Sequence, residues 1–370
     1  MTSSDAVVGR LSTLDRFLPL WIGLAMAGGL ALGAAVPRLD EWLEDLQVGT
    51  VSLPIAAGLL LMMYPVLAKV RYEDLGSARD DGVDDRKFFG VSLFLSWVVG
   101  PAFMFALAWL FLADQPAYRT GVIVVGLARC IAMVLVWNDI ARGDQERAAV
   151  LVVFNALFQV AAYSLLGWFY LTVLPGWLGL DTQGFEVGIW EVARTVLIFL
   201  GIPLAAGYAT RRIGIRRRGR AWFEERFVPR IAPITLYGLL FTIVLLFAIQ
   251  GEAITDGPAD VARIALPLLV YFAGMWTAGF LAGRWLGLPY AQTASLSFTV
   301  ASNDFELAIA VAVGVFGAAS GEALAGVVGP LIEVPVLVAL VYVALWLRTR
   351  VAWPAPAAAP APQRALSFDR

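Results

Sequence analysis

The sequence has no histidine, a single cysteine (Cys130) and only two lysines, Lys69 and Lys87. Without histidine, the chain lacks the side chain that most often shuttles protons and binds transition metals. A single cysteine excludes an intrachain disulfide and any zinc or iron–sulfur site built from several cysteines. We therefore expect no resident metal centre and no cofactor.

Charged side chains are also scarce for a chain of 370 residues. They make up 15% of the sequence, whereas hydrophobic residues make up 60%, and the mean hydropathy is +0.76. A soluble domain is nearer half apolar and a quarter charged. The composition therefore indicates a protein whose solvent is the lipid bilayer rather than two or three soluble domains.

Apolar segments long enough to cross a hydrocarbon core of about 30 Å recur along the chain. The first is too long for the core of a signal peptide and is expected to be retained. The pattern predicts an all-α polytopic membrane protein with about ten transmembrane helices, at residues 17–36, 50–68, 89–113, 119–140, 148–173, 190–210, 231–250, 261–283, 290–317 and 325–347.

Basic residues are sorted between alternate loops. If the N-terminus is cytoplasmic, most of the 27 Lys and Arg residues fall in cytoplasmic segments, above all in an expected loop at 211–230, whereas 174–189 has none. Lys and Arg accumulate on the cytoplasmic side of membrane proteins, so we predict that both termini are cytoplasmic. Topology and lipid headgroups explain the arginine run more simply than nucleic-acid binding does, and no nucleic-acid partner is expected.

Ten spans with both ends on one side divide into two halves of five. Because five is odd, the second half enters the membrane from the opposite face, which is the topology of an inverted repeat. We place the first repeat at 1–173, the second at 190–347 and a disordered cytoplasmic tail, rich in Pro and Ala, at 348–370. The halves share no strong sequence identity, so this division depends on topology and on the positions of polar residues.

Polar residues interrupt the fourth span of each half. A charge at the bilayer centre costs about 2.5–3.5 kcal/mol, and unwound backbone at that depth is tolerated only inside protein or beside water. Matching interruptions in two halves indicate a transport site at the midplane. We therefore predict that the fourth and ninth helices are interrupted and that their polar residues form a substrate and ion site: Arg129, Cys130, Ser302, Asn303, Asp304 and Glu306.

Most of these side chains also have a structural interpretation. Cys130 can be a small buried hydrophobe, and Arg129 can neutralise a nearby acid instead of contacting a substrate. Asp304 can cap a half-helix that follows it, and the same ambiguity applies to Asn303 and Ser302. Both interpretations stay open for each of these residues.

Other buried polar residues differ in what they suggest. Glu306 has apolar neighbours and no basic residue within one helical turn, which favours a functional role. Glu333, in the last span, is expected to pair with an arginine. Asn155, Gln159 and Tyr163 repeat at every fourth position and form a polar stripe, which either lines a cavity or joins helices.

The polar segments resemble the signature segments of the yeast-type arsenical-resistance permeases. These permeases belong to the bile acid/arsenite/riboflavin transporter superfamily. The resemblance extends through nearly all ten spans. It is carried by Gly126–Met133 with Trp137-Asn138-Asp139, by Asn303–Ala310 and by Gly329–Val336.

The resemblance implies secondary active efflux of arsenite, sometimes of antimonite, across the plasma membrane in exchange for protons. It maps the family's functional cysteine onto Cys130 and its functional glutamate onto Glu306. The family commonly has Asn-Asn before Phe-Glu, whereas this chain has Asn303-Asp304. The extra carboxyl group is expected to alter proton coupling or substrate range.

The chemistry of these residues agrees with the resemblance. Arsenite near neutral pH is mainly an uncharged trihydroxide with a thiophilic centre, for which a thiolate is the natural ligand. A neutral substrate gains nothing from the membrane potential, so uphill export needs a coupled ion. With no histidine in the chain, a buried carboxyl group is the available proton carrier. Our hypothesis is that Glu306 alternates between a proton and the substrate while the two halves rock around the site.

Other classes of function are kept as alternatives. A sodium-coupled transporter of an organic anion, from the same superfamily, would bind sodium at half-helix ends and place Arg129 against the anion. The short loops argue against a membrane sensor or scaffold. An intramembrane enzyme would have to rely on Asp304 and Glu306 without histidine or a metal, so we expect no enzymatic activity. No nucleotide-binding motif appears, and the question of an arsenic ATPase partner stays open.

Overall fold

The computed structural model describes residues 18–36, 38–48, 51–72, 83–180, 188–251, 255 and 257–354. The described chain is almost entirely helical. Its two short strands, β1 (Gln47–Val48) and β2 (Val51–Ser52), pair antiparallel between the first two spans, after the short helix α4 (Leu39–Asp45).

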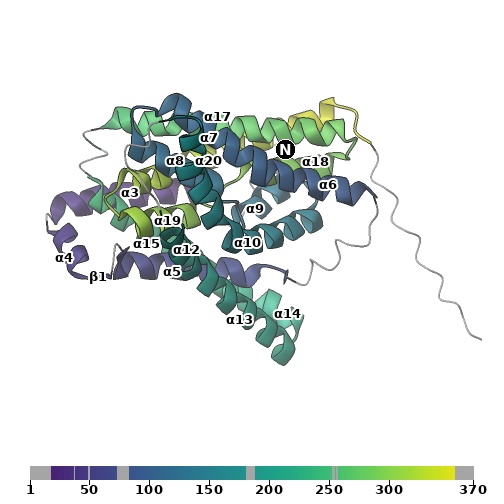
Figure 1. Cartoon of the computed structure of the whole chain (residues 1–370). Helices are drawn as coiled ribbons and strands as arrows, with labels where there is room; N and C mark the ends of the chain where they lie inside the picture. The colour runs from purple at the N-terminus through teal and green to yellow at the C-terminus, as the bar shows by residue number, and fades with distance from the viewer. Residues whose placement is uncertain are drawn as a thin grey trace, which may run out of the picture.

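The described residues form ten spans, as predicted, and most of their helix axes run across the view in Figure 1. Six helical segments are long and apolar enough to cross a membrane by length and composition, and α3, α5 and α19 are shorter apolar helices. In chain order the spans are α3 (Leu18–Ala35), α5 (Leu53–Lys69), α6–η2–α7 (Val83–Phe94, Leu95–Val99, Gly100–Phe111), α8 and α9 (Pro116–Leu127, Met133–Ile140), α10–η3–α11 (Gln145–Trp168, Phe169–Val173, Leu174–Trp177), α12–η4–α13 (Ile189–Val196, Leu197–Gly201, Ile202–Arg218), α14–η5–α15 (Arg220–Trp222, Phe223–Phe227, Val228–Ile249), α17 (Pro258–Trp285), α18 and α19 (Tyr290–Ala301, Phe305–Phe316) and α20 (Gly321–Arg350).

Prolines explain the π-helical turns η2 to η5 within these spans. A proline has no N–H, and its ring clashes with the carbonyl group four residues earlier. A wider π turn at that point moves the carbonyl aside, so the helix continues through the proline. Each of the four turns ends two residues before a proline: Pro101, Pro175, Pro203 and Pro229.

The fourth and ninth spans are interrupted, which confirms the prediction. Non-helical backbone separates α8 from α9 at residues 128–132 and α18 from α19 at residues 302–304, and we call these two stretches the breaks. Both α8 and α18 contain 12 residues, and each is followed by a residue with extended dihedral angles. The two halves of the sequence therefore place their interruptions at equivalent points.

The spans pack in two groups. The four-helix group contains the first, second, sixth and seventh spans, and the six-span group contains the others. In the four-helix group, α15 contacts α3 and α5, and α5 also contacts α13. In the six-span group, α17 contacts α7, α18 and α20, α8 contacts α7 and α20, and α10 packs against α9 and α18. The groups meet where α12 packs against α10 and α19. Figure 1 shows α3, α5 and α15 below α7, α8, α17 and α20. Each group contains spans from both halves of the sequence.

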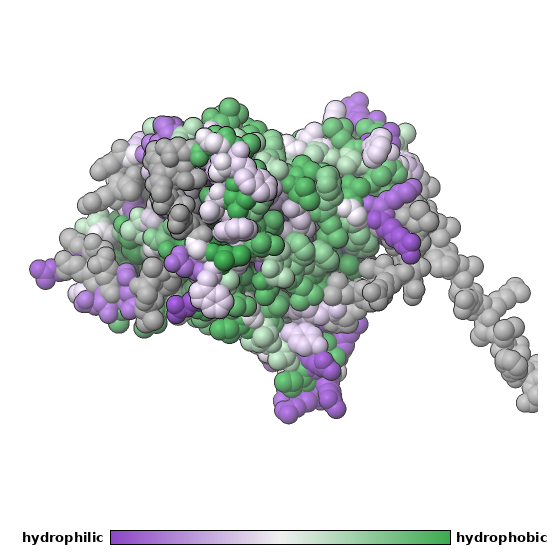
Figure 2. All heavy atoms as spheres, viewed as in Figure 1, coloured by the Kyte–Doolittle hydropathy of each residue, from purple (hydrophilic) through white to green (hydrophobic). Residues whose placement is uncertain are grey.

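The arginine-rich stretch at 211–230 is largely helical, so our prediction of a loop there was wrong. Helix α13 continues through Arg218, Gly219 turns the chain with a φ of 86°, and α14 follows directly. Hydropathy marks where the apolar segment ends, but arginine is a good helix former and the helix continues beyond it. The end of α13 and α14 projects from the body (Figure 1) and forms a hydrophilic tip in Figure 2.

The predicted termini lie mostly outside the described residues. Helix α20 continues to Arg350, so the first three residues of the predicted tail are helical. Residues 1–17 and 355–370 lie outside the described part of the chain.

Glycines let α3 and α15 approach closely. A Cβ atom at Gly29 would lie 2.6 Å from the carbonyl oxygen of Val244, and one at Gly33 would collide with the carbonyl oxygen of Ala248. Glycines four residues apart lie on one helix face and allow close helix packing inside a membrane. This contact joins the first and seventh spans.

We predict that Gly33→Val destabilises the protein by about 1–3 kcal/mol, because the added side chain must push α3 away from α15. The measurement is the unfolding temperature of the purified protein in detergent. Gly28→Val is the matched control, because a Cβ atom there meets nothing within 4 Å. Equal losses in the two variants would contradict the assigned packing.

Candidate functional site

The two breaks meet and pair with each other. Arg129 and Asn303 form an isolated antiparallel β-bridge, beside which the N–H of Cys130 donates to the carbonyl oxygen of Ser302 at 3.3 Å. These bonds satisfy backbone groups that are left without partners where a helix stops. We call this meeting point the crossing. Its antiparallel direction means that the two interrupted spans run through it in opposite senses.

Each break is also held by a side chain from the span that follows it. The Oε1 atom of Gln159 on α10 accepts the N–H of Arg129 at 2.7 Å, and the Oε1 atom of Glu333 on α20 accepts the N–H of Asn303 at 3.1 Å. In both cases the acceptor lies 30 residues after the donor. Glu333 also accepts the Ser302 hydroxyl at 2.7 Å. Among the described residues Glu333 has no arginine partner, so that prediction was wrong.

The side chains of Cys130 and Asp304 accept hydrogen bonds from the first turns of the second half-helices. The Sγ atom of Cys130 accepts the N–H of Val134 on α9 at 3.3 Å, and Oδ1 of Asp304 accepts the N–H of Leu307 on α19 at 3.0 Å. Free N–H groups and a partial positive charge lie at a helix N-terminus, and both side chains compensate them. The N-cap interpretation of Asp304 is confirmed.

Three carboxyl groups lie close enough to the thiol to interact with it electrostatically. Cys130 interacts electrostatically with Glu333, Glu306 and Asp304, and the Ser302 hydroxyl lies next to its sulfur. Cys130 and Asp304 are buried, whereas Glu306 on α19 is partly exposed. In the part of the chain that the structure describes, no three His, Cys, Asp or Glu side chains are arranged to hold a metal ion. A soft ligand would therefore meet one thiol and oxygen groups rather than a chelating cage.

The side chain of Arg129 is fully buried and points to the ends of two helices. Its Nη1 atom donates to the Tyr271 hydroxyl at 2.8 Å and to the carbonyl oxygen of Val300 at 3.4 Å, and Nη2 donates to the carbonyl oxygen of Gly126. Both carbonyl groups belong to the last turns of α8 and α18, where a helix carries partial negative charge. Arg129 has no ion pair with an acidic side chain of the described residues, so the helix ends take the place of the expected acid.

The polar stripe on α10 joins helices. Besides the bond from Gln159 to the first break, Asn155 accepts Nε1–H of Trp97 at 3.2 Å. The Tyr163 hydroxyl donates to the carbonyl oxygen of Val124 at 2.7 Å. These bonds hold α10 against the third and fourth spans, which is the commoner role of polar residues between membrane helices.

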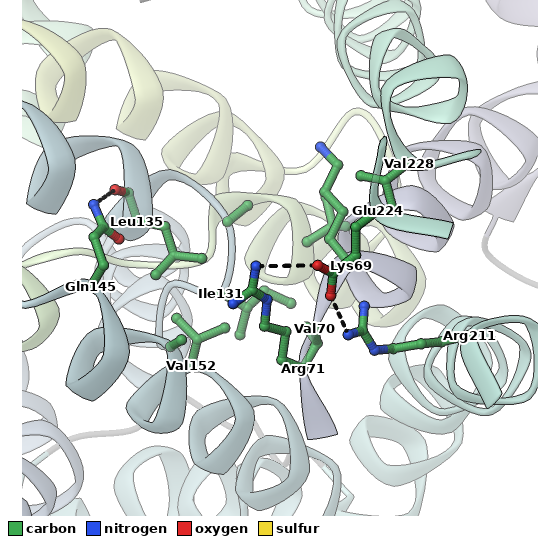
Figure 3. Close-up of a pocket in the computed structure, with 13 residues that line it drawn as sticks. Lys69, Val70, Arg71, Ile131, Leu135, Gln145, Val152, Arg211, Glu224 and Val228 are labelled. Atoms are coloured by element: carbon green, nitrogen blue, oxygen red, sulfur yellow. Dashed lines mark hydrogen bonds and ion pairs between the residues drawn. The ribbon is translucent and has the colours of Figure 1, made fainter. Parts of the chain in front are cut away.

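A cavity of about 490 Å³ reaches the first break from the arginine-rich end (Figure 3). Two of its lining residues directly follow Cys130 in the sequence. The walls come from both helix groups, so the cavity lies between them. The lining residues are Val66, Lys69, Val70, Arg71, Ile131, Ala132, Leu135, Gln145, Ala149, Val152, Arg211, Glu224 and Val228.

Glu224 joins three arginines at the edge of this cavity. Its carboxylate lies 3.0 Å from Arg211, 3.1 Å from Arg220 and 3.6 Å from Arg71. Figure 3 shows the carboxylate of Glu224 between Arg71 and Arg211. These contacts link the end of the second span to α13 and η5, all within the four-helix group.

At the end of the molecule opposite the cavity, the four-helix group and the six-span group are in contact. Gln250, at the end of α15, is 3% exposed and donates to the carbonyl oxygens of Ala318 at 2.6 Å and Ser320 at 3.4 Å. The acceptors lie between α19 and α20, in the six-span group. The groups are therefore in contact at this end and separated by the cavity at the arginine-rich end.

Known proteins share this sequence over most of its length. The family model described as the Sodium Bile acid symporter family matches residues 56–257. The chain belongs to this family. An arsenical-resistance protein Acr3 from Corynebacterium glutamicum is 56% identical over 346 residues, which cover 94% of this chain and 92% of the relative. The resemblance to arsenical-resistance permeases is therefore confirmed.

Two further relatives also match this chain over most of their length. An arsenical-resistance protein Acr3 from Alkaliphilus metalliredigens is 31% identical over 342 residues, covering 88% of this chain and 91% of the relative. An uncharacterized transporter, slr0944, from Synechocystis sp. is 36% identical over 352 residues, covering 90% and 88%. The protein is thus a multi-pass membrane protein whose relatives carry the names of transporters and resistance proteins.

The sequence predicted most residues of the crossing in this symporter-family protein. It did not predict the side chains that form hydrogen bonds with them. It missed Tyr271, which receives the Arg129 guanidinium, and the role of Gln159 in holding a break. It also missed Glu224 at the cavity. These residues lie in other spans, and no local pattern distinguishes them from ordinary interfacial or helix-joining side chains.

We predict that Glu333→Ala destabilises this protein by about 1–3 kcal/mol, because it leaves the Ser302 hydroxyl and the Asn303 N–H without their acceptor. Thermal unfolding in detergent measures the loss. Glu333→Gln keeps an oxygen at the same place and is expected to retain most of the stability. A glutamine variant as unstable as the alanine variant would contradict the acceptor role.

Proposed function

We propose that the protein exports arsenite across the plasma membrane, with antimonite as a second substrate, in exchange for protons. The observation that carries the proposal is the meeting of one thiol and three carboxyl groups where two broken helices cross, next to a cavity between two helix groups. The proposal is supported by two relatives that are named arsenical-resistance proteins, at 56% and 31% identity.

In the proposed mechanism Cys130 is the soft ligand. Arsenite is a neutral trihydroxide, and sulfur is the donor that its arsenic prefers. The thiol would displace one hydroxyl group, forming one As–S bond, while the thiol proton leaves with the hydroxyl as water. Attack by water reverses the step and frees arsenite. A single As–S bond can be reversed in this way, whereas several thiols would retain the metalloid.

Glu306 is the proposed proton carrier, with Asp304 as a second coupling group. Glu306 is partly exposed while Asp304 is buried, and the two interact. A proton that enters down a potential of 100 mV supplies about 2.3 kcal/mol. Protonation of Glu306 would remove a charge beside the thiol and change how oxygen groups hold the arsenical. Binding of proton and substrate would thereby oppose each other, as exchange requires.

Movement of the two helix groups would expose the crossing to each side in turn. We propose that the arginine-rich end is cytoplasmic, with both termini on that side, because Lys and Arg accumulate there. The cavity then opens to the cytoplasm, and the Gln250 contact closes the outer side. The moving bodies in this proposal are the four-helix and six-span groups rather than the two sequence halves, since each group takes spans from both halves.

Sodium-coupled transport of an organic anion is the second candidate, favoured by the family description. It would place Arg129 against the anion. The Arg129 guanidinium is fully buried and already donates to Tyr271, Gly126 and Val300, so an anion would have to displace these partners. Arsenite export is therefore the better supported function. Proton-coupled export of arsenite needs no ATPase partner. Because this export is independent of sodium, sodium dependence separates the two candidates.

We predict that Glu306→Gln abolishes arsenite uptake driven by a proton gradient in everted membrane vesicles, because the amide cannot carry a proton. Cys130→Ser is expected to lower arsenite resistance of a sensitive bacterial host, because oxygen is a poorer ligand for arsenic. Glu322→Gln is the matched control, since Glu322 is also an acid of a membrane helix but lies in the first turn of α20, 11 residues before Glu333. Normal proton-driven uptake by Glu306→Gln would reject the carrier role, and uptake that requires sodium would favour the second candidate.

We further predict that loss of the Gln250 contact shifts the protein away from the state with an open cavity. In a Cys130→Ser background, Ala149→Cys places a thiol in the cavity wall, and its rate of labelling by a membrane-impermeant maleimide reports access from the arginine-rich end. Adding Gln250→Leu is expected to slow labelling severalfold. Arg217→Cys, outside the cavity, should label at an unchanged rate. Unchanged labelling at position 149 would contradict the role of Gln250 in closing the far end.

A further inference from the structure

We propose that a basic pocket beside the tip of α13 binds the phosphate group of an anionic phospholipid. The pocket has a volume of about 660 Å³. Its walls come from the residues after α5, from α13 and from α14, and arginine dominates its lining. The lining residues are Tyr72, Tyr208, Arg211, Arg212, Ile215, Arg216 and Arg220. This site is separate from the crossing and does not depend on the proposed substrate.

The pocket carries more positive charge than the described acidic residues around it neutralise. Arg211 and Arg220 share one carboxylate, that of Glu224, at 3.0 and 3.1 Å. Arg212 and Arg216 are exposed, and neither has an acidic partner among the residues that the structure describes. Among the residues that the structure describes, no acidic side chain lines the pocket. Two guanidinium groups are therefore available to an anion.

Two tyrosines give the pocket a fixed wall. The rings of Tyr72 and Tyr208 pack edge to face, with centroids 5.3 Å apart. The Tyr208 hydroxyl accepts Nη1–H of Arg212 at 2.8 Å, which holds this guanidinium in place. The planar donors of arginine match the oxygens of a phosphate group, and the hydroxyl can donate a further hydrogen bond to it.

The position of the pocket favours a lipid over free phosphate. The span that leads to it exposes large apolar side chains, with Leu197 at 48%, Ile202 at 60% and Ile213 at 50%. Such side chains face acyl chains in a membrane protein, and most of the residues that line the pocket belong to the end of α13 and to α14, which form the hydrophilic tip (Figure 2). Basic pockets beside membrane helices bind lipid headgroups in this setting. A phospholipid can use both the arginines and the apolar face, whereas inorganic phosphate can use only the arginines.

The test compares retention of phosphatidylglycerol and phosphatidylcholine by the purified full-length protein, measured by native mass spectrometry from mixed micelles. We expect the protein to retain phosphatidylglycerol in preference to phosphatidylcholine. Arg212→Gln combined with Arg216→Gln is expected to weaken retention about tenfold or more, since each arginine near an anionic lipid favours binding about fivefold. Arg216→Gln alone should give an intermediate loss.

Arg217→Gln combined with Arg230→Gln is the matched control, because it removes the same charge at exposed positions outside the pocket. Equal losses in the two double variants would mean that charge acts diffusely and would overturn the site. Lack of preference for phosphatidylglycerol would do the same. Displacement of the lipid by inorganic phosphate at equal concentration would assign the pocket to a free anion instead. Since no arsenite is present, the result is independent of the proposed transport.

Discussion

A helix that stops inside a membrane leaves N–H and C=O groups that lipid cannot satisfy. Here two helices stop at equivalent points, and each supplies partners for the other. The antiparallel bridge between Arg129 and Asn303 takes up backbone groups from both breaks, and Gln159 and Glu333 accept the remaining central N–H groups. The position of every other polar group at the site follows from this pairing, because it fixes where the half-helices begin and end.

The ends of the half-helices also set the electrostatics of the crossing. The last turns of α8 and α18 present carbonyl groups, and Arg129 donates to both. The first turns of α9 and α19 present N–H groups, which Cys130 and Asp304 accept. A buried arginine without an acidic partner would be costly in an apolar medium. The partial charges of two helix C-termini, with the Tyr271 hydroxyl, stabilise it instead.

Much of this fold could be predicted from the sequence because the bilayer imposes strict rules. Length and hydropathy gave ten spans, and the cost of burying Arg129 and Asp304 marked the two breaks correctly. The same rules do not say which spans touch. Glu333 was expected to pair with an arginine, but it accepts the Asn303 N–H, a contact that depends on how α20 packs beside the crossing. The segment at 211–230 was misjudged for a different reason, since helix propensity rather than hydropathy decides how far α13 extends.

The scaffold at the crossing is nearly symmetric, whereas its chemistry is not. Gln159 and Glu333 hold equivalent backbone groups, yet one is a neutral amide and the other an acid. Cys130 and Asp304 each directly follow the bridged residue of their break, yet one offers soft sulfur and the other hard oxygen. The first half thus contributes the group suited to arsenic, and the second contributes the acids, including Glu306, suited to protons. In the proposed exchange, the binding of substrate and the binding of a proton oppose each other. Both kinds of group must therefore lie in one place. The pairing of the two breaks brings them together there.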